Sequence, residues 1–375
     1  MKIAYCLWNY SAAGGLERIA HAKATWLAAH GYDVTFIVYH QCGKDPIYPL
    51  GSIKFVDLNI KEMPPMATFY RSPAFKEMKR KLKAHLLENH YDIVISTAWF
   101  DRYFINWIHD GSKKIMEMHV PLREMEIQRK EQRWPIRLNA KLLTWKTLLK
   151  GRSFDRVVLL TDRDIPAWRR VGARVVKIPN MANLVPERIS TCDAHEVIAV
   201  GRLSPQKGFD YLLDAWAIVV NRHPDWHLSI YGDCNDKTIN DLHAQIDRNG
   251  LSRDILKGNC NDIMPRYAAS SIMVCSSRYE GFPLILLEAA TCGLPIVSFD
   301  CPTGPSDIIQ NGVNGILVPQ VGDIQGLADG ICRLIEDPAL RKQMGQAALV
   351  IPKRFSPENI MPQWDALFKE VLSEK

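Results

Sequence analysis

The sequence predicts an α/β protein that contains two consecutive parallel sheets. Short apolar runs, which suit buried strands, alternate with helical segments in the first half of the 375 residues, and the alternation starts again near residue 196. The chain is too long for one ordinary domain, and two domains of roughly 180 residues each are the natural division by size. We therefore expect two sheets, each covered by helices.

The first half should contain a parallel sheet that begins at the N-terminus. A helix is expected from about residue 16 to residue 30, where Gly31 ends it. The predicted strands span residues 3–8, 34–39, 93–96, 114–118 and 157–161.

The second half repeats this pattern and ends in a helix. The predicted strands span residues 196–201, 227–231, 254–257, 271–275 and 295–299. In the tail, residues 357–372, four apolar side chains recur at the spacing of a helical stripe: Trp364, Leu367, Phe368 and Leu372.

The segment 276–305 is the most informative part of the chain. Gly281 lets the chain turn sharply after the strand 272–275, and Pro283 suits the first position of a helix. That helix should run over 284–290, until Gly293 and Pro295 stop it. The turn then presents free backbone N–H groups at a helix N-terminus, which favours a negative ligand group such as a phosphate.

Two carboxylates flank this helix start. Glu280 lies in the turn and Glu288 lies eight residues later, about 12 Å along the helix at ~1.5 Å per residue. Because a carboxylate can accept from two vicinal hydroxyls, such a pair can hold the two sugar rings at opposite ends of a nucleotide-sugar. The alternative is an acid that serves the helix dipole and an ordinary exposed helical glutamate.

Composition narrows the location and excludes several kinds of site. No apolar run approaches the ~18 residues of a membrane helix, and residues 1–9 are too short and too polar for a signal peptide. We therefore expect a cytosolic protein. Nine scattered cysteines without C-x2-C spacing indicate neither a disulfide framework nor a zinc site.

The charge is uneven along the chain. Residues 1–185 hold 30 Lys+Arg and 17 Asp+Glu (+13), and residues 186–375 hold 17 and 24 (−7), which sum to +6. No recognised motif supports nucleic-acid binding.

The basic stretch from Arg129 to Arg152 is interleaved with apolar residues and can lie on anionic lipid. Alternatively, Leu138, Leu142, Trp145 and Leu149 form the core stripe of a covering helix whose lysines are only solvated. The basic residues are Lys76, Lys79, Arg80, Lys81 and Lys83, and then Arg129, Lys130, Arg133, Arg137, Lys141, Lys146, Lys150 and Arg152.

Breaking the bond between a sugar and a diphosphate requires positive groups on the leaving phosphates. Arg202 and Lys207 lie five residues apart across a turn flanked by Gly201 and Gly208, so both can reach a diphosphate. A metal ion is the alternative, and Asp162-Arg163-Asp164 has the D-x-D pattern of metal-dependent transferases. We interpret it as a helix cap, because it directly follows a strand.

Several elements in order resemble the retaining group 1 glycosyltransferases with the GT-B fold. Glu280 and Glu288 match the E-x7-E signature of that family, and residues 200–208 are similar to its G-R-x-x-x-x-K-G element. Further matches are Ile178-Pro179-Asn180, Gly14-Gly15, His119 and residues 301–305. The resemblance implies two Rossmann-like doubly wound domains facing across a cleft, spanning 1–178 and 179–356, with a C-terminal helix, 357–375, that crosses back to the first.

The resemblance also implies a set of site residues. Glu280 and His119 would act at the transferred sugar, and Arg202, Lys207 and Gly15 would bind the donor diphosphate. The residues expected to contact the donor sugar or nucleotide are Glu288, Gly281, Phe282, Pro283, Leu284 and Asn180, together with the loop 258–262.

The function that follows is transfer of a hexose or N-acetylhexosamine from a nucleotide-sugar, with UDP favoured. The enzyme should retain the anomeric configuration and need neither metal nor cofactor. The acceptor would be a saccharide or lipid-linked saccharide of polysaccharide synthesis, at the inner face of the cytoplasmic membrane. A GT-B nucleotide-sugar epimerase without a separate acceptor is the alternative, and a non-catalytic sugar-nucleotide binder is a third hypothesis.

Overall fold

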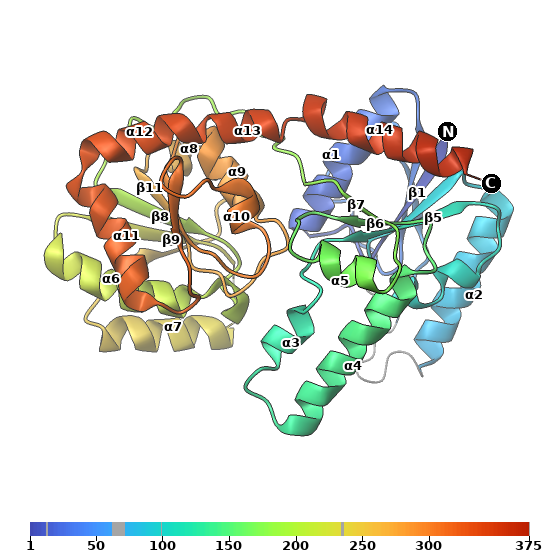
Figure 1. Ribbon diagram of the computed structural model, residues 1–375, viewed down its shortest axis with the longest axis horizontal. Coiled ribbons are helices and arrows are strands. Elements are labelled where there is room, and N and C mark those ends of the chain that lie inside the picture. Colours follow the sequence, from blue (N-terminus) through green and yellow to red (C-terminus); the bar gives the residue numbers. More distant parts are fainter. Residues whose placement is uncertain (13, 62–71, 99, 234–235, 375) are drawn as a thin grey trace. The chain divides into compact units, whose positions relative to one another are not determined.

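The computed structural model describes residues 1–12, 14–61, 72–98, 100–233 and 236–374 (Figure 1). Its contacts divide the chain into two compact units. Unit 1 comprises Met1–Leu160, Asp164–Pro179 and Ile360–Lys375, and unit 2 comprises Thr161–Arg163 and Asn180–Asn359. Each unit has its own sheet and its own apolar core.

Unit 1 contains a seven-stranded sheet in the order β3-β2-β1-β4-β5-β6-β7. All its pairings in the described residues are parallel, and the chain fills the two sides of β1 in turn, which is a doubly wound arrangement. The strands are β1 (Lys2–Leu7), β2 (Asp33–Val38), β3 (Lys54–Asp57), β4 (Ile93–Ser96), β5 (Lys113–Met118), β6 (Arg156–Leu159) and β7 (Val175–Lys177).

The helices of unit 1 pack around this sheet. A core cluster joins apolar side chains of the helices, such as Met78, Leu82 and Trp168, to strand residues such as Val94 and Val157. The helices are α1 (Gly15–Ala29), α2 (Pro73–Asn89), α3 (Glu124–Gln128), α4 (Trp134–Gly151), α5 (Ile165–Arg170) and most of α14 (Pro357–Ser373), with short 3-10 turns at Asp101–Tyr103 and Ile105–Trp107.

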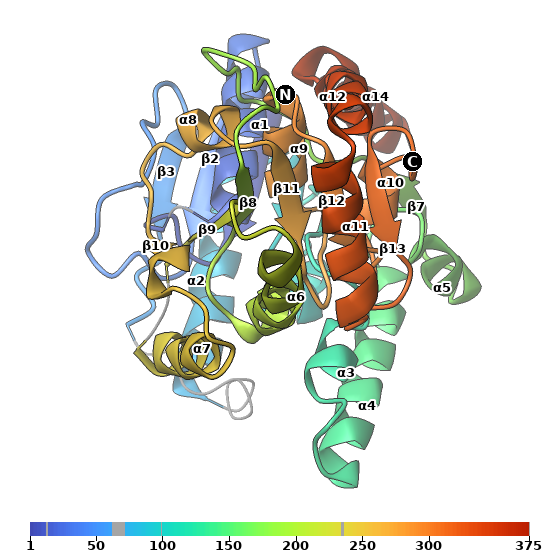
Figure 2. The same ribbon diagram turned by 90° about the vertical axis from the view of Figure 1, so that its left-hand side faces the viewer.

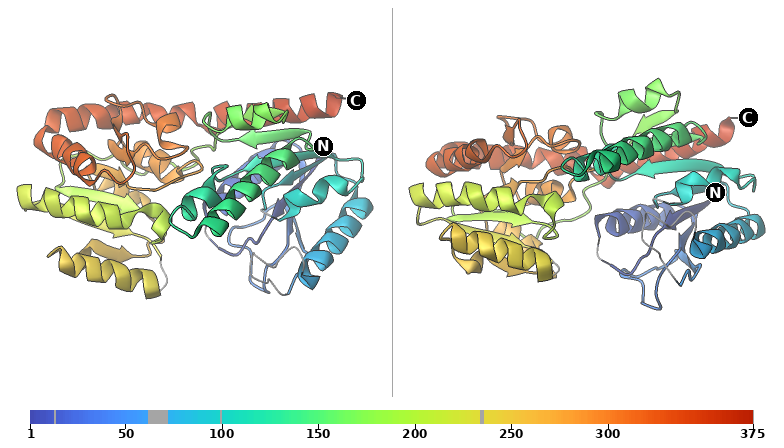
Figure 3. Two further views of the ribbon diagram at one scale, coloured as in Figure 1. Left: turned by 60° about the horizontal axis from the view of Figure 1, so that its bottom comes forward. Right: turned by 90° about the horizontal axis from the view of Figure 1, so that it is seen from below.

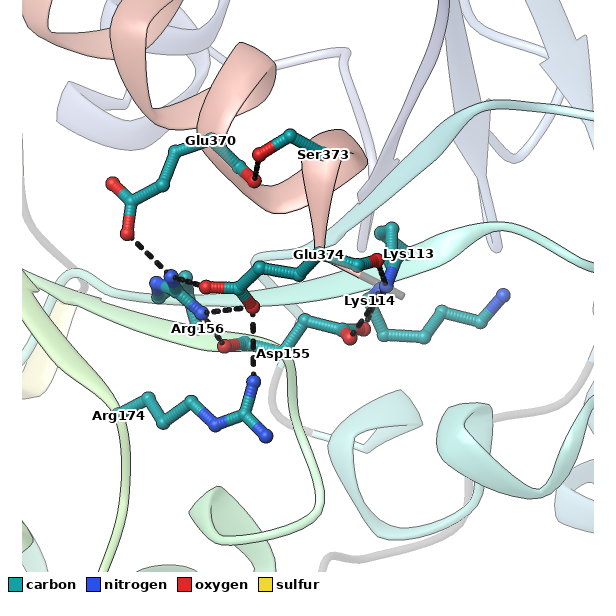
Figure 4. A network of polar contacts seen from close by, with 8 residues as sticks. All are labelled: Lys113, Lys114, Asp155, Arg156, Arg174, Glu370, Ser373 and Glu374. Carbon is teal, nitrogen blue, oxygen red and sulfur yellow. Dashed lines mark hydrogen bonds and ion pairs between the residues drawn. The ribbon is translucent and has the colours of Figure 1, made fainter.

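The C-terminal helix α14 is attached to unit 1 by apolar packing and by a polar network. Trp364, Phe368 and Val371 are buried. At the end of the helix, the Arg156 guanidinium donates to Glu370 Oε1 at 2.5 Å and to both carboxylate oxygens of Glu374 (Figure 4). Leu372, which the spacing placed in the apolar stripe, is 38% exposed. Val371 occupies the buried position, because it lies seven residues after Trp364.

Unit 2 contains a six-stranded sheet in the order β10-β9-β8-β11-β12-β13, again with parallel pairings throughout its described strands. Helices α6 and α11 join one apolar core with this sheet (Figure 2). The strands are β8 (Glu196–Val200), β9 (His227–Tyr231), β10 (Leu256–Gly258), β11 (Ile272–Cys275), β12 (Ile296–Phe299) and β13 (Gly315–Val318). The helices are α6 (Phe209–Arg222), α7 (Asp236–Arg248), α8 (Met264–Ala268), α9 (Leu284–Thr291), α10 (Pro305–Ile308), α11 (Ile324–Glu336), α12 (Pro338–Ala348) and α13 (Val350–Arg354), with 3-10 turns at Pro205–Lys207 and Arg253–Ile255.

The predicted α/β class with two doubly wound parallel sheets is confirmed, and the local predictions need three corrections. Strands β3, β7 and β13 were not predicted; β3 and β7 are edge strands of three or four partly exposed residues. The strand expected at 254–257 starts only at Leu256, since a 3-10 turn occupies its first residues. Pro283 precedes α9 with an extended backbone and is not its first residue.

Candidate functional site

The candidate site residues of unit 2 follow two neighbouring strands, β8 and β11. In a doubly wound sheet the chain leaves these two strands in opposite directions, and ligands bind beyond their carboxyl ends at this switch point. The loop after β8 contains Arg202 and Lys207, and the loop after β11 contains Glu280. The topology therefore brings together two elements that lie more than 70 residues apart in the sequence.

Lys207 and Glu280 form a buried ion pair at this switch point. Lys207 Nζ lies 2.7 Å from Glu280 Oε1, and the side chains are 17% and 7% exposed. The same carboxylate oxygen accepts a hydrogen bond from Ser277 Oγ at 2.5 Å. Burial lowers the pKa of the Lys207 ammonium, but the charge of Glu280 outweighs this effect, so the pKa of Lys207 lies above its ordinary value. The site thus keeps a cation at a fixed place in a partly dehydrated environment.

Two glycines allow the loops to approach each other this closely. Gly208 has a φ of +63°, and a Cβ there would lie 2.1 Å from the carbonyl oxygen of Ser276. A Cβ on Gly232, at the end of β9, would lie 1.9 Å from the carbonyl oxygen of Gly201. Since side chains do not fit at either position, the glycines are needed for the backbone path that carries Lys207.

The turn at residues 301–305 fixes the backbone of Glu280. The Glu280 N–H donates to the carbonyl of Pro302 at 3.3 Å, and the Thr303 hydroxyl donates to the Glu280 carbonyl. Thr303 has a φ of +63°, which is unusual for a β-branched residue. Backbone strain of this kind concentrates at functional sites, where the surrounding contacts maintain it.

Glu288 is also buried, at 5% exposure, on α9. The Tyr267 hydroxyl donates to its Oε2 at 3.3 Å. The alternative of an ordinary exposed helical glutamate is therefore wrong, because a buried carboxylate requires polar partners. Of the other residues predicted at this end of the donor, Phe282 and Asn180 are buried, and Gly281, Pro283 and Leu284 form the entry to α9.

Arg202 differs from Lys207 in its surroundings. Its side chain is exposed, and among the residues that the structure describes none forms an ion pair with it. The structure brings Lys207 and Glu280 into contact and leaves Arg202 in the same loop available to an anion.

The two predicted residues of unit 1 occupy the corresponding edge of the other sheet. Gly15 is the first residue of α1, after β1, and His119 directly follows β5. Gly14, at the N-cap, has an extended backbone and no capping side chain, so the first N–H groups of α1 are not satisfied by a cap.

His119 contacts a buried ion pair that the sequence did not predict. Its Nε2 lies 3.1 Å from Glu117 Oε1, and the same oxygen pairs with Lys23 Nζ. Burial opposes ionisation of Glu117, but the charges of Lys23 and His119 outweigh it, and the pKa of Glu117 falls to about 2. Burial lowers the pKa of Lys23. The Lys23 ammonium also lies over the Trp364 ring, 4.5 Å from its centroid.

The signals for these missed residues are present but weak. Glu117 and His119 lie two apart along one strand direction and thus on one face. Lys23 appears in the sequence as one more lysine of a helix, and only the sheet behind α1 makes it a buried residue. Ser277 lies three residues before Glu280, a spacing that has no meaning outside this turn.

The D-x-D residues do not cap the following helix as we interpreted. Asp164 occupies the N-cap position of α5, but its side chain makes no capping hydrogen bond. Its Oδ2 accepts from the Leu122 N–H at 2.7 Å instead. The side chain therefore connects two loops of unit 1, and burial raises its pKa.

Comparison with known proteins gives two family models. The model of "Glycosyltransferase Family 4" matches residues 13–184, and that of "Glycosyl transferases group 1" matches residues 190–349. An uncharacterized glycosyltransferase of Haemophilus influenzae is 27% identical over 98% of this chain and 99% of its own. The amylovoran biosynthesis glycosyltransferase AmsD of Erwinia amylovora is 26% identical over 97% and 98%.

Solved structures share the fold of the whole chain. A sucrose-phosphate synthase of Thermosynechococcus elongatus matches with a TM-score of 0.83 at 19% identity, over 100% of both chains. HepE of Anabaena matches with a TM-score of 0.78 at 20% identity, over 98% of this chain and 99% of its own. At these identities the likeness concerns the fold.

Proposed function

Because the chain belongs to the group 1 glycosyltransferases, we propose that it transfers a hexose or N-acetylhexosamine from a UDP-sugar, with retention of the anomeric configuration. The acceptor is a saccharide or lipid-linked saccharide of polysaccharide synthesis. The observation that carries the proposal is the buried Lys207–Glu280 pair beyond the carboxyl ends of β8 and β11. The comparisons give no support to the epimerase alternative.

In this proposal Lys207 and Arg202 stabilise the departing diphosphate. Lys207 is a preorganised cation, since its raised pKa keeps it protonated and its carbonyl accepts a hydrogen bond from the Ser276 hydroxyl at 3.0 Å. Preorganised charges in a dehydrated site stabilise a developing anion without reorganisation. Arg202 adds a second, exposed cation with a bidentate fork. Two protein cations in this place make a metal ion unnecessary.

Glu280 positions the transferred sugar, and Glu288 holds the ribose. The carboxylate of Glu280 has one oxygen engaged by Lys207 and Ser277, and its backbone is fixed by the turn 301–305. A carboxylate held in this way can accept from sugar hydroxyls without attacking the sugar. The leaving phosphate then helps to deprotonate the acceptor hydroxyl on the same face, which accounts for retention.

The unit 1 residues act on the acceptor side of the donor. The N–H groups at the start of α1, beginning at Gly15, suit an anionic group of the donor. His119 lies beside Glu117, with its Nε2 3.1 Å from the Glu117 carboxylate, and is available to a hydroxyl of the transferred sugar or of the acceptor.

The donor and pathway are supported by relatives. HepE was solved with UDP-glucose, and a pneumococcal O-GlcNAc transferase, GtfA, with UDP and GlcNAc. AmsD belongs to amylovoran biosynthesis. We propose a UDP-sugar donor and a role in polysaccharide synthesis for this chain as well. We place the enzyme at the inner face of the cytoplasmic membrane, where its basic half contacts anionic lipid. In the part of the chain that the structure describes, no helix has the length and apolar character required to cross a membrane.

Thermal unfolding in the presence of a panel of nucleotide-sugars tests the donor. A ligand at 100 times its dissociation constant adds ~2.7 kcal/mol to the stability. We expect stabilisation by one or two UDP-sugars and a smaller effect of the corresponding GDP-sugars. NMR of the product formed with a saccharide acceptor should then give the anomeric configuration of the donor. Inversion, or epimerisation of the donor without an acceptor, would refute the proposal.

A further inference from the structure

Helix α4 turns its large apolar side chains outward. Its buried residues are small or polar for the most part: Ala140, Thr144, Thr147, Leu148 and Gly151. The residues that a core-facing helix would bury are exposed instead, and the core-stripe alternative of the sequence is therefore wrong. They are Trp134 (70%), Leu138 (40%), Leu142 (50%), Trp145 (52%) and Leu149 (41%).

These exposed side chains form one continuous stripe. At about 100° per residue, the five side chains fall within roughly 80° of the helix circumference, and the stripe is about 22 Å long. The buried residues lie on a separate arc of the same helix. Figure 3 shows that α4 is one uninterrupted helix, so the stripe is not broken by a bend.

Basic side chains border the stripe on both sides. On the same helical projection, Arg137 and Lys141 lie along one border, and Lys146 and Lys150 along the other. The helix Trp134–Gly151 contains no Asp or Glu. An apolar stripe between two rows of long cations is the pattern of a helix that lies in a membrane interface. There the apolar groups enter the acyl region and the lysines extend to the phosphates.

The neighbouring surface continues this pattern. Trp107 is 61% exposed, and the ammonium groups of Lys150 and Lys79 lie 4.2 Å and 5.5 Å from its ring centroid. Helices α3 and α4 form a hairpin whose turn, with the basic residues Arg129, Lys130 and Arg133, extends away from the sheet of unit 1 (Figures 1 and 2). Tryptophan and basic residues are enriched at the membrane–water interface.

We propose that α4 inserts its Trp134–Leu149 stripe into an anionic bilayer and lies parallel to its surface. This proposal specifies which element of the chain contacts the membrane. It rests on the proposed function for the lipid-linked acceptor, whereas binding of α4 to a bilayer does not depend on the proposed function. Charge decides between a bilayer and a second copy of the chain. Two α4 faces in contact would oppose only like charges, whereas anionic lipid complements them.

Co-sedimentation with lipid vesicles tests the proposal without requiring activity. The probe is a vesicle of phosphatidylcholine and phosphatidylglycerol in equal parts, compared with phosphatidylcholine alone. We expect binding of the wild-type protein to the anionic vesicles, weakened as the ionic strength rises above 0.1 M, where exposed charges are screened within ~10 Å. The triple variant Leu138→Gln, Leu142→Gln, Trp145→Gln should bind at least about tenfold more weakly. A second triple variant should lose most of the salt-sensitive part of vesicle binding: Lys141→Gln, Lys146→Gln, Lys150→Gln.

Two control variants have the same chemistry at other places. Lys237→Gln, Arg248→Gln, Arg333→Gln removes three exposed charges from unit 2, and Val185→Gln, Val313→Gln, Val350→Gln removes three exposed apolar groups from the same unit. Both should bind anionic vesicles almost as the wild type does. Equal losses in control and α4 variants would overturn the proposal, since they would indicate a general charge or apolar effect.

Fluorescence locates the helix in the bilayer. Lipids with brominated chains should quench part of the tryptophan emission, and Trp134→Phe, Trp145→Phe should lose that part while it still binds. Turnover with a soluble acceptor analogue should be unchanged in all α4 variants, so a failure to bind lipid and a failure to transfer sugar give separate readouts. Absence of wild-type sedimentation at low salt, or a dimer that the triple apolar variant abolishes, would overturn the proposal.

Discussion

Lys207 and Glu280 depend on each other at the residue scale, because each is buried and each supplies the opposite charge. In Glu280→Gln the amide keeps the shape and can still bond Ser277, but the negative charge is lost. We expect the variant to fold and to bind UDP, and its turnover to fall about 10²- to 10³-fold, the usual cost of one preorganised polar group at a reacting centre. Initial rates and calorimetric titration with UDP measure the two effects separately.

A conservative exchange at a neighbouring ion pair provides the control for Glu280. Asp210 makes a bidentate pair with Arg278, with distances of 2.7 and 2.6 Å, next to the same loops. Asp210→Asn should lower stability without a comparable effect on turnover. Wild-type turnover in Glu280→Gln would remove Glu280 from the proposed mechanism.

Glu288 has a different expected effect because it is assigned to the nucleotide end of the donor. Glu288→Ala should raise the donor KM and leave kcat nearly unchanged, which is the signature of lost uniform binding. Tyr267→Phe removes its hydroxyl partner and tests whether a general loosening of α9 produces the same change. If the donor KM stays at the wild-type value, Glu288 does not bind the donor and has only a structural role.

Glu117 links stability to pH. Its pKa in the folded protein is about 2, below the ordinary 4.5, so its stabilising effect is present above pH 4.5 and is lost as the pH falls towards 2. That effect is worth about 3 kcal/mol. Glu117→Gln should therefore unfold at lower urea concentration than the wild type at pH 7, and the difference should shrink as the pH falls below 4.5.

The double variant Lys23→Met, Glu117→Gln distinguishes the effect of the ion pair on stability from its effect on activity. It should regain part of the stability, because no buried charge is then left without a partner. Activity should not return with the stability if Glu117 also orients His119. A pH-independent difference between wild type and Glu117→Gln would be evidence against the ion pair.

At the scale of elements, α14 depends on packing against parts of the chain that are distant in sequence. Phe368 is fully buried and contacts the Tyr32 and Trp364 rings. Phe368→Ala should cost about 3–5 kcal/mol, as for other large-to-small core substitutions. Limited proteolysis should then release the C-terminal segment.

The control lies one residue further along α14. Lys369 is 69% exposed and pairs with Asp365, four residues earlier. Lys369→Ala should change the stability by about 0.3–0.5 kcal/mol. Equal proteolytic sensitivity of the two variants would contradict the assignment of Phe368 to the core of unit 1.

At the scale of the whole molecule, we predict that the reaction needs no metal ion. We place Lys207 and Arg202 where a metal ion would otherwise neutralise the leaving group, so excess EDTA should leave the initial rate nearly intact. Arg202→Ala should lower that rate by orders of magnitude, because an exposed cation assigned to the diphosphate is lost. Initial rates with and without EDTA, for the wild type and the variant, measure both effects.

The control for Arg202 is another arginine of unit 2. Arg222 ends α6, is 46% exposed and pairs with Asp329 at 3.1 Å. Arg222→Ala should leave the rate unaltered. Inhibition by EDTA that manganese or magnesium reverses would contradict the prediction. Asp162 and Asp164 would then be the candidate metal ligands.

The fold and a large part of the candidate site could be predicted, because their signals are local. Buried parallel strands need continuous apolar runs, and the turns after β8 and β11 need glycine and proline at particular places. Arg202, Lys207 and Glu280 could be named for the same reason, since each lies in such a turn, and Glu288 could be named because it follows Glu280 at the E-x7-E spacing. Short edge strands such as β7 were missed, because three partly exposed residues leave too little periodicity to detect.

Hydrophobic periodicity and turn chemistry act over a few residues, and for that reason the α/β class, the two sheets and the loops that carry the candidate site follow from the sequence alone. Which side chains meet depends on the tertiary structure. The pairs Lys207–Glu280 and Lys23–Glu117 join residues 73 and 94 positions apart, and such contacts depend on strand order. The direction of the α4 stripe was also decided there, since a helical pattern defines a face but not whether that face meets a sheet or the solvent.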